Sequence, residues 1–193
     1  MNPRKKSTFY EIFKKLTNAK TLKKKTAAKK TIKSRKKVSA IPKGYNSITP
    51  YLIVNNAAKA IDFYKKAFAA KVVLCLQRPD GQVSHAELKM GDSKIMLADE
   101  HPEMGARGPQ AFGGSPVSIH LYVKKVDAMV EKAHSAGAKI VRPITDMFYG
   151  DRSATLADPF GHQWTVSTHI ENVTNPSGRV FLAQQKDRLD HIA

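Results

Sequence analysis

YLIVNNAAKAIDFYKKAFAAKVV at residues 51–73 and HLYVKKVDAMVEKAHSAGAKIV at residues 120–141 together decide the fold, because the second stretch repeats the first. Placing Val54 on Val123, an offset of 69 positions, brings the apolar residues of the two stretches into register. One residue fewer in the second copy then restores the match at the end of the repeat. An internal repeat of this kind indicates two copies of one structural unit.

Each copy contains the same succession of elements. A short apolar run comes first, an apolar stripe at helical spacing follows, and three strand-like runs separated by turn residues complete the copy. The helical stripes begin at Ala57 and at Val126. The expected strands are Tyr51–Val54, Lys71–Gln77, Val83–Met90 and Lys94–Ala98, and then Ile119–Val123, Lys139–Ile144, Ser153–Leu156 and Gln163–Thr168.

This succession predicts an α+β fold built from two βαβββ modules, at about residues 46–100 and 116–170. A four-stranded sheet with one helix buries only one of its faces, so we expect the modules to pair. The paired domain, residues 45–172, is expected to form a curved eight-stranded sheet with the helices outside and a concave cup for a ligand. Residues 173–193 are expected to form a C-terminal helical extension.

The charge of the chain is concentrated at its N-terminus. Residues 1–44 contain 16 of the 33 Lys and Arg residues but one of the 16 acidic residues, so they carry +15 of the net charge of +17. We expect a largely disordered basic tail with a short amphipathic segment at Phe9–Leu16. Such a tail suits non-specific binding to nucleic acid or to an anionic surface, or it serves only as a solvated tail.

Composition also bears on the compartment. The single cysteine, Cys75, excludes an intramolecular disulfide and fits a reducing environment, and its apolar neighbours suggest a packed thiol. We find neither an apolar run long enough to cross a membrane nor a secretory signal. The expected location is therefore the cytoplasm.

Three segments carry a resemblance to a known family: YLIVNNAAKAIDFYKKAF, GDSKIMLADE and YGDRSATLADPFGHQWTVSTHIE. Together with the repeat, they resemble the vicinal oxygen chelate superfamily, and more narrowly its PhnB-like glyoxalase/bleomycin-resistance branch, over about residues 46–172. The resemblance implies paired modules, frequent homodimers and a cup for a small molecule. Members of the superfamily include metal-dependent lyases, isomerases, dioxygenases and antibiotic-binding proteins, so the fold does not decide the function.

Metal-dependent members of the superfamily place one ligand on the first strand and one on the last strand of each module, usually His, Glu or Gln. The corresponding positions in this chain are Thr49, Met96, Ser118 and Thr165. Hydroxyl and thioether groups bind divalent ions poorly unless stronger donors are near. We therefore expect no metal cofactor at these positions.

A shift of two residues keeps a side chain on the same face of a strand and brings other donors into consideration. His120 would then share a face with Ser118, and His169 with Thr165. Together with Glu87, which shares a strand face with His85, these histidines are the alternative ligands if a divalent metal does bind. Each of them is also a common kind of structural residue.

The most suggestive polar cluster is the run from Tyr149 to Arg152. Arg152 has the geometry to hold a carboxylate or phosphate with two hydrogen bonds, and Asp151 could orient it. We predict a ligand site formed by Tyr122, Tyr149, Asp151 and Arg152, with His120 as the candidate catalytic acid or base. A structural ion pair is the alternative interpretation of Asp151 and Arg152.

The leading hypothesis is a glyoxalase/bleomycin-resistance-like protein that binds a small molecule without the usual metal site and acts as a homodimer. The first alternative is a metal-dependent lyase, isomerase or dioxygenase of the same superfamily. The second is a nucleic-acid-associated protein that acts through residues 1–44. The sequence leaves open whether the cup is catalytic.

Overall fold

The computed structural model describes residues 38–173. The expected amphipathic segment at Phe9–Leu16 and the expected C-terminal helix lie outside the described residues. The part that precedes the first strand, residues 38–50, contains no helix or strand. No helix within the described range is long and apolar enough to cross a membrane.

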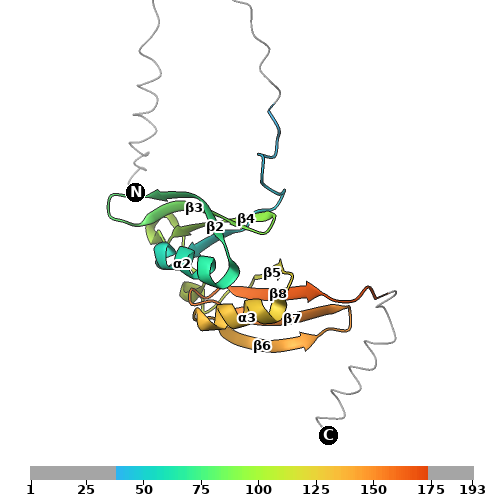
Figure 1. Cartoon of the computed structure of the whole chain (residues 1–193). Helices are drawn as coiled ribbons and strands as arrows, with labels where there is room; N and C mark the ends of the chain where they lie inside the picture. Colours follow the sequence, from blue (N-terminus) through green and yellow to red (C-terminus); the bar gives the residue numbers. More distant parts are fainter. Residues whose placement is uncertain (1–37, 174–193) are drawn as a thin grey trace, which may run out of the picture. The chain divides into compact units, whose positions relative to one another are not determined.

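The described chain folds into two βαβββ modules, as the repeat predicts (Figure 1). The first comprises β1 (Tyr51–Val54), α2 (Ala57–Phe68), β2 (Lys71–Gln77), β3 (Val83–Met90) and β4 (Ser93–Asp99). The second comprises β5 (Ser118–Tyr122), α3 (Val126–Ser135), β6 (Lys139–Asp146), β7 (Asp151–Ala157) and β8 (Gln163–His169). Between them, the short 3-10 helices η1 (Pro102–Met104) and η2 (Pro109–Phe112) interrupt the linker.

Both sheets have the same topology. The strand order is β1-β4-β3-β2 in the first sheet and β5-β8-β7-β6 in the second. The first and last strands of each module pair in parallel, and the remaining pairs are antiparallel. Within residues 38–173 the two sheets are hydrogen-bonded separately and do not join into one eight-stranded sheet.

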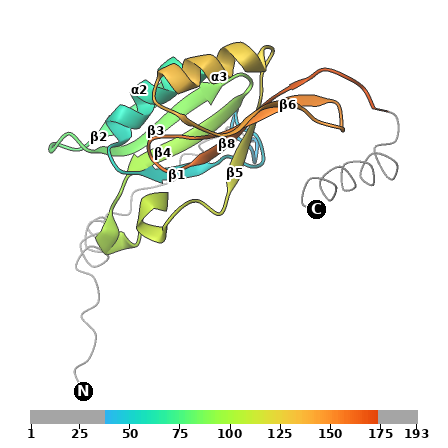
Figure 2. The ribbon, with the colours of Figure 1, turned by 90° about the horizontal axis from the view of Figure 1, so that it is seen from below.

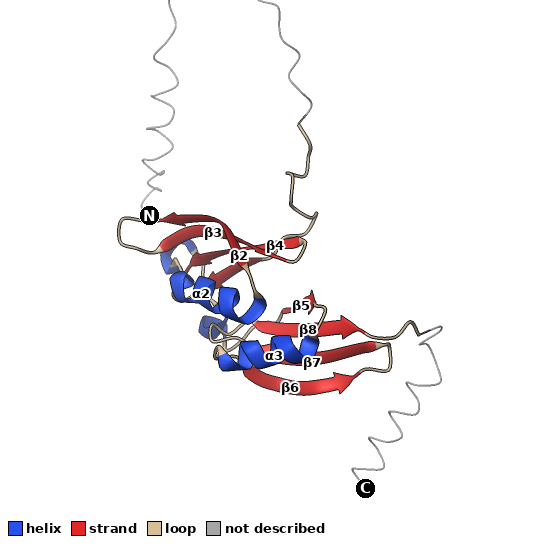
Figure 3. Ribbon diagram, viewed as in Figure 1, coloured by secondary structure: helices blue, strands red, loops and turns tan. Residues whose placement is uncertain are grey.

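One face of each sheet is covered by a helix. Figure 2 shows α2 and α3 on the same side of the strands, and Figure 3 separates helices from strands by colour. Strand β3 alternates between buried positions on the α2 side and more exposed ones, as a sheet covered on one side requires. The opposite face of each sheet is open, and we call it the open face.

The beginnings of the two helices retain the symmetry of the repeat. The first N–H group of α2, at Ala57, donates to the Asp99 carboxylate at 2.7 Å. The first N–H group of α3, at Val126, donates to the Thr168 hydroxyl at 2.9 Å. Asp99 and Thr168 are separated by the same 69 positions as Val54 and Val123. A side chain from the last strand therefore satisfies a free helix donor in both modules.

An aromatic cluster joins the modules. The rings of Tyr64 and Phe68, both on α2, lie 5.5 and 4.7 Å from the Trp164 ring on β8. The buried Asp158 carboxylate accepts hydrogen bonds from the Tyr64 hydroxyl at 2.7 Å and from Trp164 Nε1 at 2.9 Å. Trp164 is fully buried in this core, on the helix side of the second sheet.

Strand β2 differs from the sequence expectation. All seven of its residues are exposed, because β2 is the outer strand of its sheet and α2 leaves its side chains uncovered. The prediction that Cys75 is a packed thiol is therefore wrong, and its thiol is exposed. Apolar neighbours in the sequence could not reveal that this strand lies at the edge.

Candidate functional site

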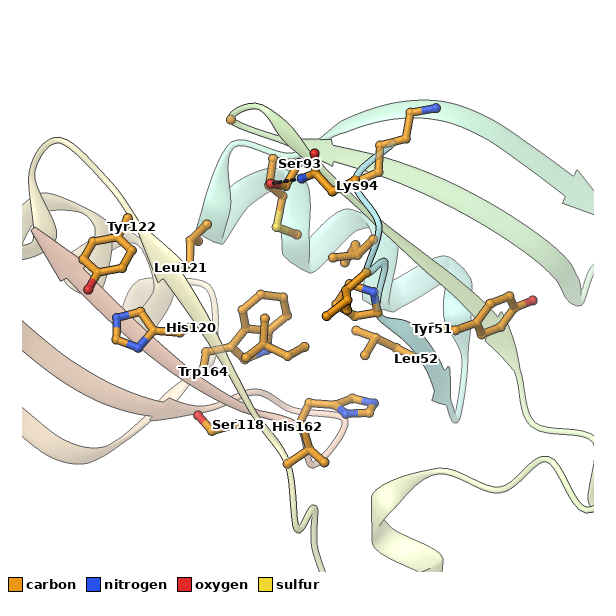
Figure 4. A pocket seen from close by; sticks show the side chains of 18 of the residues that line it. Tyr51, Leu52, Ser93, Lys94, Ser118, His120, Leu121, Tyr122, His162 and Trp164 are labelled. Carbon is orange, nitrogen blue, oxygen red and sulfur yellow. Dashed lines mark hydrogen bonds between the residues drawn. The ribbon is translucent and has the colours of Figure 1, made fainter. Parts of the chain in front are cut away.

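The two modules enclose a cavity of about 810 Å³. Its walls come mainly from β1, β4 and β5, with Trp164 and His162 from the second module. In Figure 4, Leu52 and Trp164 lie toward the centre of this space, whereas Tyr51 points away on one side and His120 and Tyr122 on the other. The polar groups that could carry chemistry thus lie on the two open faces and flank the apolar part of the cavity.

A buried carboxylate organises the open face of the second sheet. Asp151 is 2% exposed, and its two oxygens accept from the Tyr122 hydroxyl at 2.7 Å and from His169 Nδ1 at 2.7 Å. His169 Nε2 lies 3.0 Å from Asn172 Oδ1. Strand pairing explains this meeting, because Asp151 on β7 lies directly beside His169 on β8. The result is a hydrogen-bonded chain of Tyr122, Asp151, His169 and Asn172.

Within this hydrogen-bonded group, the residues favour each other's charge states. Burial tends to raise the pKa of Asp151, but hydrogen bonds from Tyr122 and His169 outweigh burial and hold that pKa below its usual value. Hydrogen bonds to Asn172 and Asp151 raise the pKa of His169. The bond to Asp151 likewise raises the pKa of Tyr122. Asp151 therefore stays ionised, and Tyr122 stays a neutral phenol.

His120 lies beside this hydrogen-bonded group, and one of its two ring nitrogens forms a hydrogen bond. Its Nε2 is 2.9 Å from Ser167 Oγ, and the Ser167 hydroxyl donates to Ser153 Oγ at 2.9 Å. Because the Ser167 proton points to Ser153, Ser167 accepts from His120, which places the proton of a neutral His120 on Nε2. The His120 ring stacks on Tyr122 with centroids 4.7 Å apart. Its Nδ1 has no hydrogen-bond partner within residues 38–173.

Arg152 does not join this group. Asp151 and Arg152 alternate along β7, so they project from opposite faces. The Arg152 guanidinium donates to Asp127 on α3 at 2.8 and 3.0 Å and to Asp146 on β6 at 2.7 Å. These carboxylates, Asp127 foremost, raise the pKa of Arg152 further. The structure thus separates Arg152 from Tyr122 and Asp151, and both of its edges are occupied by carboxylates.

Tyr149 lies in the turn that leads into β7 and is half-buried, with the Phe148 ring 5.2 Å away. The next residue, Gly150, has φ of 92° and receives the N–H groups of Ile170 and Glu171 on its carbonyl. A Cβ at Gly150 would collide with the Glu171 carbonyl oxygen. Glycine is therefore required here, and it lets β7 begin with Asp151 facing Tyr122.

The four positions that correspond to metal ligands in the superfamily are poor donors in this fold. Ser118 Oγ and Thr165 Oγ1 bond each other at 3.1 Å on the second sheet, and Met96 lies on the first. The alternative ligands are also divided, since Glu87 is on the first sheet and His120 and His169 are on the second. Residues 38–173 contain no group of three or more His, Cys, Asp or Glu side chains placed to hold a metal. The donor set does not fit a metal, and we derive no chemistry through one.

Sequence reasoning missed a second polar group, on the open face of the first sheet. The Tyr51 hydroxyl lies 3.1 Å from His85 Nδ1, and His85 Nε2 lies 3.7 Å from Glu87 Oε1. The Lys94 ammonium lies 3.0 Å from Glu87 Oε2 and 3.9 Å from the centre of the Tyr45 ring. Hydrogen bonds from Tyr45 and Lys94 lower the pKa of Glu87. In the sequence, the indication of this polar group was that His85 and Glu87 share one face of a strand.

The sequence model of the Glyoxalase/Bleomycin resistance protein/Dioxygenase superfamily matches residues 44–166. The chain belongs to this superfamily. It is 40% identical over 144 residues to an uncharacterized protein of Mycobacterium bovis, covering 73% of this chain and 95% of that protein. An uncharacterized protein of Mycobacterium tuberculosis matches equally, with 85% of its length covered.

Solved structures of other proteins show the same fold. TioX from Micromonospora sp. ML1 superposes with a TM-score of 0.52 at 25% identity, covering 64% of this chain and 98% of TioX. A gene product of Arabidopsis thaliana gives a TM-score of 0.53 at 27% identity, with coverage of 64% and 98%. The predicted α+β fold with two βαβββ modules is confirmed, and placement in the PhnB-like branch stays a prediction.

Proposed function

We propose that this superfamily member binds a small molecule on the open face of its second sheet, next to His120, Tyr122 and Asp151. The observation that carries the proposal is the fixed ring of His120, whose Nε2 is engaged by Ser167 and whose Nδ1 is left for a ligand. An imidazole whose one nitrogen is held by a neighbouring side chain can present its other nitrogen to a ligand.

The chemistry of this face favours a ligand with an O–H or N–H donor. A neutral His120 presents a lone pair on Nδ1. The Tyr122 hydroxyl donates its hydrogen bond to Asp151 at 2.7 Å, so its oxygen has lone pairs left for a ligand. Both side chains therefore offer acceptor atoms to the ligand. Should the site be catalytic, the same Nδ1 is the atom that removes a proton, with Ser167 and Ser153 holding the ring in place.

A ligand screen on the full-length protein tests this proposal. Compounds that raise the melting temperature would be re-measured by calorimetry with His120→Gln and Tyr122→Phe, and with Lys59→Gln on the exposed side of α2 as the matched control. We expect both site variants to weaken binding about tenfold. His120→Gln removes a hydrogen bond to the ligand, and Tyr122→Phe also removes the bond that ties this side chain to Asp151. Ligands that bind all four proteins equally would refute the site.

We further propose that the protein acts as a homodimer. The outer strands expose apolar side chains that a soluble monomer would ordinarily cover, among them Val73 at 50% and Val141 at 57%. A second copy of the chain offers the same surface in return, as two-fold interfaces require. Light scattering should give twice the chain mass, and Val73→Glu with Val141→Glu should lower it. A wild-type monomer at micromolar concentration would contradict the proposal.

The charge of the tail supports a second candidate function, the binding of polyanions. Residues 1–44 carry +15, whereas the remainder carries the other +2 of the net charge. We expect duplex DNA of arbitrary sequence to bind the full chain with an affinity that falls steeply as salt rises. A gel shift that persists after residues 1–44 are removed would show that the tail is not responsible.

A further inference from the structure

The open face of the first sheet carries a continuous row of side chains that the proposed ligand site does not use. Tyr51 pairs with Met96, Met96 with Glu87, and Glu87 with Leu74, so the row crosses all four strands. Directly paired residues on neighbouring strands project from the same face. This row therefore places a phenol, an apolar floor and a carboxylate on one surface opposite α2.

The two contacts of His85 on this face indicate the direction of the Tyr51 hydroxyl. His85 Nε2 faces Glu87 Oε1 at 3.7 Å, so the tautomer with its proton on Nε2 directs that proton toward the carboxylate. His85 Nδ1 is then an acceptor, and the Tyr51 hydroxyl at 3.1 Å donates to it. Because the phenol O–H is used in the hydrogen bond to His85, the Tyr51 oxygen offers only lone pairs to a ligand. Tyr51 is 48% exposed and can reach one.

Glu87 supports His85 and is not itself free for a ligand. Its side chain is 12% exposed, and that of its ion-pair partner Lys94 is 11% exposed. Tyr45, from the segment before β1, covers the Lys94 ammonium with its ring. This packing holds the carboxylate in place behind His85.

A row of lysines runs beside this group. Lys94 pairs with Lys89 on β3, and Lys89 pairs with Lys71 on β2. The row lies two residues along β3 from Glu87, a separation of about 7 Å. Like charges placed directly opposite each other destabilise a sheet. Lys71 and Lys89 are exposed and form no ion pair within residues 38–173, so a bound anion would relieve their repulsion.

We propose that this face binds a small aromatic compound of the hydroxybenzoate type, which carries a carboxylate and an acidic hydroxyl on one ring. The hydroxyl lies against Tyr51 and the carboxylate against Lys89 and Lys71. The ring rests on Leu74, which is 39% exposed and lies beside Glu87 on the neighbouring strand. An acceptor oxygen at one end, cationic lysines at the other and an apolar side chain between them match such a ligand in both chemistry and order.

The arrangement also allows a proton to move. The ligand hydroxyl gives its proton to the Tyr51 oxygen, and Tyr51 passes its own proton to His85 Nδ1. The products are a ligand phenolate and a cationic His85, whose charge is stabilised by Glu87. No bond other than those to these two protons changes, and the cationic His85 is the positive charge nearest to the phenolate.

This inference goes beyond the proposed function, since the site lies on the other sheet and shares no residue with it. The test uses the full-length protein and 4-hydroxy-3-nitrobenzoate, whose phenolate absorbs visible light, at a pH at which the free probe is mostly protonated. Calorimetry measures binding, and the phenolate absorbance reports the proton transfer. We expect wild type to bind the probe and to raise that absorbance.

Variants separate the two faces of the protein. Tyr51→Phe and His85→Gln should each weaken probe binding about tenfold, equivalent to about 1.4 kcal/mol, and abolish the absorbance rise. Lys89→Gln should weaken binding but leave the absorbance rise of the bound probe. Lys59→Gln, on the exposed side of α2, is the matched control and should bind as wild type does. Tyr122→Phe tests whether the probe instead binds on the second sheet. The melting temperature of each variant verifies folding.

Three outcomes would overturn the inference. The first is the absence of probe binding to wild type. The second is binding that Tyr51→Phe and His85→Gln leave unchanged, or that occurs without phenolate absorbance. The third is binding that is lost in Tyr122→Phe, which would assign the probe to the second sheet and support the other site.

Discussion

Asp158 links the two modules through buried hydrogen bonds. Besides the side chains of Tyr64 and Trp164, it accepts the backbone N–H groups of Phe160 and His162, both at 2.9 Å. Burial and the nearby Asp158 charge raise the pKa of Tyr64 well above its usual value, so the phenol remains a donor. A buried carboxylate of this kind is tolerated because each of its lone pairs has a partner.

Replacing Tyr64 with Phe should lower the free energy of unfolding by about 1–3 kcal/mol, because Asp158 loses one donor while it stays buried. Urea denaturation followed by Trp164 fluorescence measures the change. Tyr149→Phe is the control, since its half-buried ring lies in a turn and away from this core. Equal stability of wild type and Tyr64→Phe would show that the bond to Asp158 contributes nothing.

The Asp151–His169 pair should make stability depend on pH. Asp151 has a pKa below its usual 3.8 and stabilises the fold above that pH, while its contribution disappears as the pH falls through the lowered value. His169 has a pKa above its usual 6.5 and stabilises the fold below that pH, with the contribution lost as the pH rises through the raised value. The pair should therefore stabilise most between about 4 and 6.5.

His169→Gln tests this dependence. The difference in melting temperature between wild type and the variant should be largest inside that window and should shrink at alkaline pH. His169 is 51% exposed, so solvent screening keeps the effect small. A difference that stays constant from acid to alkaline pH would contradict a charged pair.

At the scale of elements, the turn before β7 decides how the second sheet presents Asp151. Gly150→Ala should destabilise the protein strongly, because φ is positive and the added Cβ meets the Glu171 carbonyl. Gly81→Ala is a matched control with φ of 85° and open space around the Cβ position. It should cost only the backbone strain of about 1–2 kcal/mol. Chemical denaturation should rank Gly150→Ala as the less stable; equal losses would mean that the close approach to Glu171 is unimportant.

The elements themselves were largely predictable. The expected strands Tyr51–Val54, Lys71–Gln77 and Val83–Met90 coincide with β1, β2 and β3, because turn residues bound each apolar run. The prediction at Tyr149–Arg152 treated neighbours in sequence as neighbours in a site. Strand alternation instead sends Asp151 to the open face and Arg152 to the α3 side. The same period of two that identified the strands separates these two side chains.

At the scale of the whole molecule, the side chains at the metal-ligand positions of the superfamily decide whether a metal cofactor is expected. The superfamily's ligand positions hold Thr49, Met96, Ser118 and Thr165, which are weak donors for divalent ions. We expect protein purified without chelator to contain no stoichiometric metal and to keep its melting temperature in the presence of a chelator. About one bound ion per chain, or a shift of several degrees with Ni²⁺, Zn²⁺, Mn²⁺ or Co²⁺, would contradict this expectation.

The sequence by itself determined the repeat, the two βαβββ modules and the family, because these depend on local periodicity and turn residues that recur at a constant offset. Only the tertiary structure decided which side chains meet. Tyr51 and His85 are 34 positions apart, and Tyr64 and Asp158 are 94 apart. Strand order and the docking of α2 against the second module create these contacts, and neither leaves a periodic trace in the sequence. Cys75 follows the same rule, since exposure depends on which strand forms the edge of the sheet.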